Sequence, residues 1–275
     1  VQAALMLFLS GYVKKACISD NLAPAVDAYF AEPAAFDVFS AWLATVGYAV
    51  QIYCDFSGYS DMAIACAALL GYKLALNFDF PYFAVSIQDF WRRWHISLSS
   101  WLRDYLYISL GGNRGSKLFQ YRNLMLTMLL GGLWHGAAWT FVAWGGLHGA
   151  ALVLHREWSK RVGRRPGMGL LGPLLTFWFV CVCWIFFRAA SFEDAWTTLR
   201  AFALFQAPGE ARLEGLAWLV FPALLGAHAV SRFTHAAQLG RRTPAPLFAV
   251  WAGVVAALAL AFTPVAYKPF IYFQF

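Results

Sequence analysis

The chain has 275 residues, of which 61% are apolar or aromatic and only 13% are charged. Soluble domains carry about 25% charged residues, so this chain has too little charge to cover a water-facing surface. The composition excludes a disordered chain, a collagen-like chain and an ordinary soluble enzyme. Its apolar runs are long and unbroken, and a membrane span must satisfy its backbone hydrogen bonds internally. The sequence therefore predicts an all-α, polytopic helical integral membrane protein.

Lys and Arg together number 21 and Asp and Glu 14, which gives a formal net charge of +7. Basic residues collect in the cytoplasmic loops of membrane proteins, so this charge indicates topology and contact with lipid headgroups. We expect no binding of nucleic acid. The five cysteines lack the spacing of a metal site, and Cys181 and Cys183 lie inside an apolar run. The sequence therefore predicts no metal site. We also expect no tightly bound cofactor.

The first 72 residues contain two apolar segments separated by a polar one. Residues 1–13 are interpreted as the end of a membrane span, which is followed by two lysines. Residues 16–37 contain four acidic residues and two prolines and are interpreted as a loop. Residues 38–72 would form a helix of about 52 Å, which exceeds a hydrocarbon core of about 30 Å. The sequence predicts either a tilted, protruding helix or a break near Gly58.

Residues 73–122 hold seven arginines and lysines and no uninterrupted span, which predicts an interfacial segment on the cytoplasmic side. Residues 123–154 are apolar and have basic residues on both flanks. Two full spans need about 40 residues, more than this segment has. Basic flanks are expected on the cytoplasmic side of the membrane. Either one flank is an exception to this rule, or the segment is a re-entrant hairpin that turns near Gly136. Further spans, joined first by a mixed-charge loop and then by a basic loop, are predicted at residues 168–187, 215–230 and 246–264.

Residues 90–105 show the clearest helical periodicity in the chain. Tryptophan, leucine and tyrosine side chains fall on one face and arginines and serines on the other, which predicts one helix lying in the membrane interface. His95 lies at the edge of the apolar face, where a packing role and a functional role both stay open. The arginines of the polar face are candidates for binding the phosphates of a cytoplasmic donor, namely Arg92, Arg93 and Arg103.

His135 lies deep in an apolar segment between glycines. An ionisable residue at such a position indicates function, and an imidazole can take a proton near neutral pH. A structural histidine that bridges two helices is the alternative. His148 repeats the pattern weakly, and we expect it to pack on a different face of any continuous helix.

Two carboxylates, Asp55 and Asp61, flank Gly58 inside an apolar segment. Intramembrane carboxylates usually face a cavity or a partner, whereas a helix break at the membrane surface would accommodate them at little cost. Both interpretations stay open. The turn at residues 111–114 is interpreted as a plain loop, with an anion-binding nest as the alternative.

Taken together, several motifs resemble the membrane-bound O-acyltransferase family, most closely its bacterial alginate O-acetyltransferase branch, which is similar to peptidoglycan and exopolysaccharide acetylases. The resemblance runs over essentially the whole chain and is densest between residues 48 and 155. Its motifs are Tyr53–Asp61, Phe90–Ser99, Trp101–Ile108, Gly111–Arg114, Gly132–Gly136, Trp184–Ala189 and Phe270–Phe275.

The resemblance implies a multi-pass enzyme of the bacterial inner membrane, with residues 1–275 as one membrane-embedded O-acyltransferase domain. His135 matches the catalytic histidine of the family, and His95 matches a second histidine often needed for activity. Substrate binding is then expected from the three arginines, from Asp55 and Asp61, and from Trp134 and Asn113 in the motifs. Family members usually carry several more N-terminal helices, so the chain resembles the C-terminal part of such a protein.

By the same resemblance, the donor is an acyl thioester such as acetyl-CoA, and the acceptor is a hydroxyl of an exported polysaccharide such as alginate. A periplasmic acetyltransferase or another polysaccharide-modifying protein is the expected partner, along with membrane lipids. Transfer of D-alanyl groups or acyl transfer to peptidoglycan is an alternative within the family. A non-enzymatic transporter would more often show a repeated pair of broken helices, which the sequence lacks.

Overall fold

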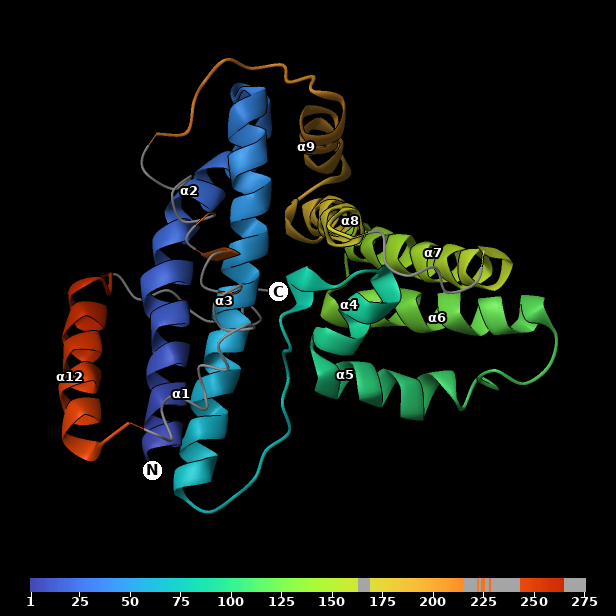
Figure 1. Ribbon diagram of the computed structural model, residues 1–275. Coiled ribbons are helices and arrows are strands. Elements are labelled where there is room, and N and C mark those ends of the chain that lie inside the picture. The colour runs from blue at the N-terminus through green and yellow to red at the C-terminus, as the bar shows by residue number, and fades with distance from the viewer. Residues whose placement is uncertain (163–168, 215–221, 223, 226–227, 229–242, 265–275) are drawn as a thin grey trace. The chain divides into compact units, whose positions relative to one another are not determined.

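The computed structural model describes residues 1–162, 169–214, 222, 224–225, 228 and 243–264. Their regular structure is helical, apart from one isolated bridge between Phe36 and Ala211. This agrees with the predicted all-α class. The chain divides into two compact units, Val1–Leu76 with Gly209–Phe275 and Asn77–Pro208, and each is described by itself (Figure 1).

The first unit begins with a continuous helical run. Helix α1 (Gln2–Tyr12) passes through a π-helical turn (Val13–Ser19) into α2 (Asp20–Ala31). The prediction of a loop at residues 16–37 is therefore wrong up to Ala31. Ion pairs neutralise both lysines of the π turn, so their charge does not end the helix. In the π-helical turn the backbone departs from the hydrogen-bond pattern of an α-helix. The Cys17 carbonyl oxygen of this turn accepts a hydrogen bond from Asn21 Nδ2 at 3.0 Å.

Helix α3 (Val38–Leu69) runs for 32 residues, about 48 Å, without interruption at Gly58. The predicted alternative of a break near Gly58 is therefore wrong, and the segment forms one long continuous helix. Asp37 caps its start by accepting from the Ser40 N–H at 2.8 Å. Gly58 lies where α3 crosses α1, because a Cβ there would approach the Gly11 carbonyl oxygen to 2.6 Å. This glycine permits close helix contact and does not bend the helix.

Helix α12 (Ala245–Ala261) packs beside α1 within the same unit. The Tyr12 hydroxyl is hydrogen-bonded to Thr263 at 3.0 Å, and Asn21 Nδ2 donates to the Phe262 carbonyl at 2.8 Å. The predicted span at residues 246–264 therefore corresponds to a helix. The predicted span at residues 215–230 and the basic loop after it lie largely outside the described residues.

The second unit contains α4 (Ile87–Arg93) and α5 (Ile96–Trp101), which a π-helical turn (Leu102–Tyr107) extends. Four longer helices follow. These are α6 (Lys117–His135), α7 (Trp139–Val162), α8 (Leu171–Arg188) and α9 (Phe192–Leu204). Helix α8 confirms the helix predicted at residues 168–187. By length and hydropathy it is the one helix of the described residues that could cross a membrane, and α12 is apolar but shorter. Helix α9 lies where a loop was predicted, because the Ser191 side chain caps its first turn by accepting from the Asp194 N–H at 3.1 Å.

The predicted single helix at residues 90–105 is wrong, since it breaks at His95. This residue has a left-handed backbone with φ of 43°. Nearby, Asn77 takes the backbone bonds that would continue the helix: its carbonyl accepts from the Ile96 N–H at 3.0 Å, and its side-chain Oδ1 accepts from the Ser97 N–H at 3.2 Å. The chain therefore reverses at the histidine.

Helices α6 and α7 form an antiparallel hairpin with its turn at residues 136–138, as Figure 1 shows. The predicted turn near Gly136 is confirmed. The helices have 19 and 24 residues, so they extend well beyond the apolar stretch 123–154. The apolar part of α6, from Asn123 to His135, spans only about 20 Å. A hairpin that ends partway through a bilayer therefore stays a prediction.

Glycines allow the two backbones of this hairpin to touch. A Cβ on Gly132 would clash with the Phe141 carbonyl oxygen, and a Cβ on Gly145 would clash with the Met128 carbonyl oxygen. Both neighbours are main-chain atoms, which cannot rotate away. The adjacent Gly146 differs, because its nearest neighbour is the Leu129 side chain at 3.6 Å, an ordinary contact.

We expect Gly145→Ala to lower the free energy of unfolding by about 1–3 kcal/mol, because the new methyl group must push the helices apart. Gly146→Ala is the matched control one residue away and should be neutral or slightly stabilising, since alanine favours a helix over glycine. The measurement is the thermal unfolding midpoint of the purified protein in detergent. Equal midpoints for the two variants would contradict the close approach at Gly145.

Candidate active site

His135 is the last residue of α6 and lies at the turn of the hairpin. Its half-buried imidazole is surrounded by aromatic edges and faces from three helices. The ring centroids lie 5.1 Å from Trp134, 5.3 Å from Trp144 on α7, and 5.1 Å from Phe187 on α8. The hairpin and α8 therefore fix the position of this ring.

His95 lies between α4 and α5, outside the long apolar helices. Its Nδ1 is 3.2 Å from Asn77 Oδ1, and its ring stacks on Phe78. Because Asn77 Oδ1 also accepts from the Ser97 N–H, it is an acceptor, so His95 Nδ1 carries the proton and donates. Burial and then the nearby charge of His135 lower the pKa of His95 to about 4. At neutral pH this imidazole is therefore uncharged.

Asn77 is a site residue that the sequence did not reveal. It orients His95 and holds the chain reversal at the same time. It precedes His95 by 18 residues, so the helical periodicity of residues 90–105 carries no signal for it.

The expectation that His148 lies on a different face applied to a continuous helix, and the turn at residues 136–138 separates His135 on α6 from His148 on α7. The Trp144 ring contacts both imidazoles, with centroids 5.3 Å from His135 and 4.9 Å from His148. His148 is completely buried. Its Nδ1 accepts from the Trp91 indole N–H at 3.3 Å, and Phe90 stacks on its ring.

The three predicted donor-binding arginines differ in their surroundings. Arg93 is held inside the second unit by Asp89, at 2.9 Å, and by the carbonyl oxygen of Asp79, at 3.3 Å. Arg103 forms two bonds to Asp104 on an exposed surface. Arg92 is exposed, and the described part of the chain gives it no ion pair. Of the three, Arg92 is the one best placed to meet a ligand.

Asn113 lies at the opposite end of α6 from His135, because the helix rises about 27 Å between Lys117 and His135. Its Oδ1 accepts from the Tyr107 hydroxyl at 2.8 Å, and its carbonyl accepts from Gln120 Nε2 at 2.7 Å. The turn thus fastens the base of α6, as a plain loop would. The structure does not bring Asn113 to the histidine. Trp134, in contrast, adjoins it and is 63% exposed.

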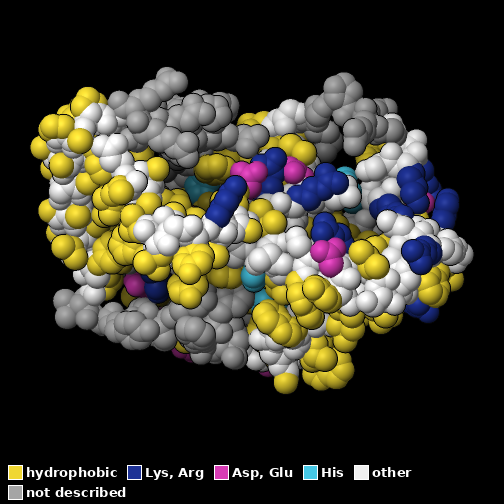
Figure 2. Space-filling view, turned by 90° about the horizontal axis from the view of Figure 1, so that it is seen from below, with side chains coloured by type: hydrophobic (Ala, Val, Ile, Leu, Met, Phe, Trp, Pro, Cys, Tyr) yellow, Lys and Arg dark blue, Asp and Glu magenta, His cyan; other side chains and the backbone are white. Residues whose placement is uncertain are grey.

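The base of the hairpin is basic, and its exposed cations are Arg114, Lys117, Arg122, Lys160 and Arg161. Figure 2 shows Lys and Arg side chains at this end of the second unit and, together with acidic side chains, across the middle of the face. Such a distribution fits a membrane surface of anionic headgroups.

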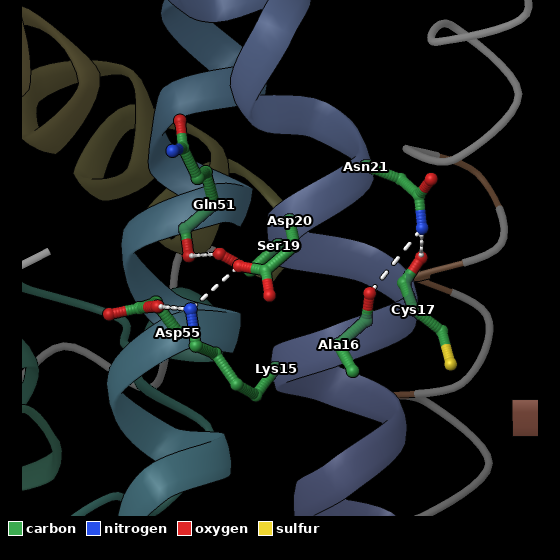
Figure 3. Close-up of polar contacts among 8 residues, drawn as sticks. All are labelled: Lys15, Ala16, Cys17, Ser19, Asp20, Asn21, Gln51 and Asp55. Atoms are coloured by element: carbon green, nitrogen blue, oxygen red, sulfur yellow. Dashed lines mark hydrogen bonds and ion pairs between the residues drawn. The ribbon is translucent and has the colours of Figure 1, made fainter. Parts of the chain in front are cut away.

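Asp55 and Asp61 belong to the first unit and are both ion-paired. Lys15 Nζ lies 2.8 Å from Asp55 and 2.6 Å from Asp20, and Lys14 Nζ lies 2.6 Å from Asp61. Figure 3 shows Lys15 reaching between Asp20 and Asp55. The Asp55 side chain is only 3% exposed. The interpretation of these carboxylates as a helix break at the membrane surface is therefore wrong.

Removing one partner of a buried ion pair leaves an uncompensated charge and costs about 3–5 kcal/mol. We expect Asp55→Asn to cost about 3 kcal/mol, the lower end of that range, because Lys15 keeps Asp20. Arg212→Gln is the control: Arg212 pairs with Asp37 at 3.0 Å but is 78% exposed, so its loss should cost less than about 1 kcal/mol. Unfolding midpoints in detergent measure both effects, and an Asp55→Asn midpoint as high as that of Arg212→Gln would refute the buried pair.

The sequence of the chain was compared with those of known protein families. The family model of the membrane-bound O-acyltransferases matches residues 1–196, which include both histidines and every predicted binding residue. The chain belongs to the membrane-bound O-acyltransferase family. Because this is a family of integral membrane proteins, the predicted membrane-embedded class is confirmed together with the helical fold.

Individual relatives refine this assignment. The chain is 52% identical over 194 residues to the "Probable alginate O-acetylase AlgI" of Azotobacter vinelandii, which covers 69% of this chain and 38% of that protein. It is 46% identical over 202 residues to the "Peptidoglycan O-acetyltransferase" of Helicobacter pylori, covering 73% and 38%. The "Teichoic acid D-alanyltransferase" of Streptococcus thermophilus is 32% identical over 173 residues, covering 55% and 41%. The matches thus span about two fifths of the length of these membrane-bound O-acyltransferases.

Proposed function

We propose that this protein transfers acetyl groups from a thioester donor toward hydroxyl groups of an exported polysaccharide, alginate or a similar polymer. The observation that carries the proposal is His135 at the hairpin turn, enclosed by the rings of Trp144 and Phe187, in a chain of the membrane-bound O-acyltransferase family. The identity of 52% to an alginate O-acetylase supports the acetyl group and this class of acceptor.

The chemistry follows from the needs of acyl transfer. A hydroxyl is a weak nucleophile until a base removes its proton, and an imidazole is suited to that task. His135 takes the proton while the hydroxyl oxygen attacks the thioester carbonyl carbon, whose π electrons move onto oxygen. Collapse of this intermediate breaks the carbon–sulfur bond, and the leaving thiolate receives the proton from His135. The ester and a free thiol are the products.

The donor in this proposal is acetyl-CoA or another acyl thioester that carries phosphate. Arg92 is exposed on α4, close in sequence to His95, and is suited to pair with that phosphate. We propose that the protein works as a multi-pass protein of the bacterial inner membrane, in contact with lipids. A periplasmic acetyltransferase or polysaccharide-modifying protein would carry the acetyl group onward to the polymer.

Peptidoglycan is the second candidate acceptor, supported by the identity of 46% to a peptidoglycan O-acetyltransferase. Transfer of D-alanyl groups has weaker support, since that relative is 32% identical. Supplying isolated membranes with alginate oligosaccharides or with peptidoglycan fragments, each with labelled acetyl-CoA, distinguishes the two acceptors. A transporter would neither transfer the acetyl group nor consume the thioester.

His135→Ala should abolish acetylation while the protein still accumulates in the membrane, because general base catalysis contributes about 10²–10⁴ in rate. The measurement is the acetyl content of the secreted polymer, normalised to the membrane level of each variant. His155→Ala is the control, since His155 lies further along α7, 3.5 Å from Ser159, and should keep normal acetylation. Unreduced acetylation by His135→Ala at normal abundance would exclude the catalytic role.

Arg92→Gln should raise the KM for the acyl donor at least tenfold, because a charge-assisted phosphate bond contributes about 1.5–3 kcal/mol. Its unfolding midpoint should not change, since the side chain is exposed. Arg93→Gln should behave in the opposite way, losing stability through its bonds to Asp89 and Asp79. A donor KM that is unchanged in Arg92→Gln would remove the phosphate contact from the proposal.

A further inference from the structure

Two buried N–H groups on α7 have no hydrogen-bond acceptor among the described residues. They are the indole Nε1–H of Trp144 and the imidazole Nε2 of His148. The two residues lie one helical turn apart, with ring centroids separated by 4.9 Å. Trp144 is 2% exposed and His148 is 0% exposed. Buried polar groups are nearly always paired, so two adjacent unpaired groups need an explanation.

The contacts of His148 determine where its proton lies. The Trp91 indole can only donate, and it donates to His148 Nδ1 at 3.3 Å. Nδ1 therefore presents its lone pair, and the neutral imidazole carries its proton on Nε2. Four aromatic rings hold the imidazole in this orientation, those of Phe90, Trp91, Trp144 and Phe179. Both unpaired groups are consequently N–H donors.

The donors adjoin the proposed reaction centre. The Trp144 ring is 5.3 Å from the His135 ring, centroid to centroid, and the two planes are nearly perpendicular at 86°. Both residues lie in the second unit, where the hairpin and α8 fix them. The Trp144 indole is therefore in ring contact with the group that takes the hydroxyl proton in the proposed function.

We propose that Trp144 Nε1–H and His148 Nε2–H bind the carbonyl oxygen of the acyl group and stabilise the negative charge that forms on it. This inference rests on the proposed function. Two donors without a neighbouring acceptor suit a ligand atom that only accepts, which describes a carbonyl oxygen and its oxyanion but not a cation or an amine. In a site shielded from water such donors act strongly, because they need no rearrangement when the charge develops.

Substitutions of His148 separate the two nitrogens of its ring. His148→Gln places an amide N–H near the position of Nε2, whereas His148→Asn offers an acceptor near Nδ1 and no donor near Nε2. We expect His148→Asn to lower kcat roughly 10²-fold, as loss of an oxyanion donor does, with a donor KM within threefold of wild type. His148→Gln should retain at least one third of the wild-type kcat.

The opposite order, with His148→Asn active and His148→Gln inactive, would overturn the proposal and assign His148 to the bond with Trp91. Equal losses in the two variants would also overturn it, in favour of packing alone. Absence of acyl transfer by the wild-type protein would instead contradict the proposed function, so the two failures are distinguishable.

Trp144→Phe tests the second donor, because it removes the N–H and keeps an aromatic ring between the histidines. We expect a loss of at least tenfold in kcat. Trp178→Phe is the matched control: Trp178 lies on α8, stacks on Phe202 and is partly exposed, so its kcat should equal that of the wild type. A wild-type kcat in Trp144→Phe would overturn the role of the indole.

Discussion

The direct contact between the backbones of α6 and α7 is the constraint on which the candidate active site depends. At Gly132 and Gly145 no side chain separates the two backbones, so the helices approach closely there and the hairpin turns at Gly136. His135 then ends one arm, while Trp144 on the other arm reaches its ring. A larger residue at either glycine would separate the arms and move the imidazole away from the aromatic rings that orient it.

Charged residues in the apolar helices obey a related constraint, because each needs a partner at short range. In the first unit, Lys15 lies between Asp20 and Asp55, and Lys14 meets Asp61. The close crossing of α1 and α3 at Gly11 and Gly58 makes these pairs possible. In the second unit Arg93 meets this requirement through Asp89 and Asp79, whereas Arg92 is exposed to solvent. In the proposed function, stability and donor binding would use these adjacent residues of one motif.

Local patterns in the sequence predicted those features that depend on residues near in the chain. The turn at Gly136 followed from glycine and from the limited length of an apolar segment, and α8 from its apolar run. The break at His95 was missed because Asn77, which competes for the helix hydrogen bonds, lies 18 residues upstream. Lys14 and Lys15 were interpreted as the end of a span because their charges looked uncompensated. Asp55, a partner of Lys15, lies 40 residues later in the chain, so the sequence did not reveal this ion pair. Ser191 followed by Asp194 is a sequence pattern typical of the start of a helix. This pattern was missed when the segment was predicted to be a mixed-charge loop, so α9 was not predicted.

The proposed function requires a histidine that activates a hydroxyl for attack on a thioester. The most direct test of this function is transfer in isolated membranes that contain the protein and its proposed periplasmic partner, with acetyl-CoA labelled in the acetyl group and an alginate oligosaccharide as acceptor. Labelled ester is expected to accumulate on the oligosaccharide, with one free thiol released for each acetyl group transferred. Thioester that remains intact, with no label on any polysaccharide acceptor offered, would contradict this function.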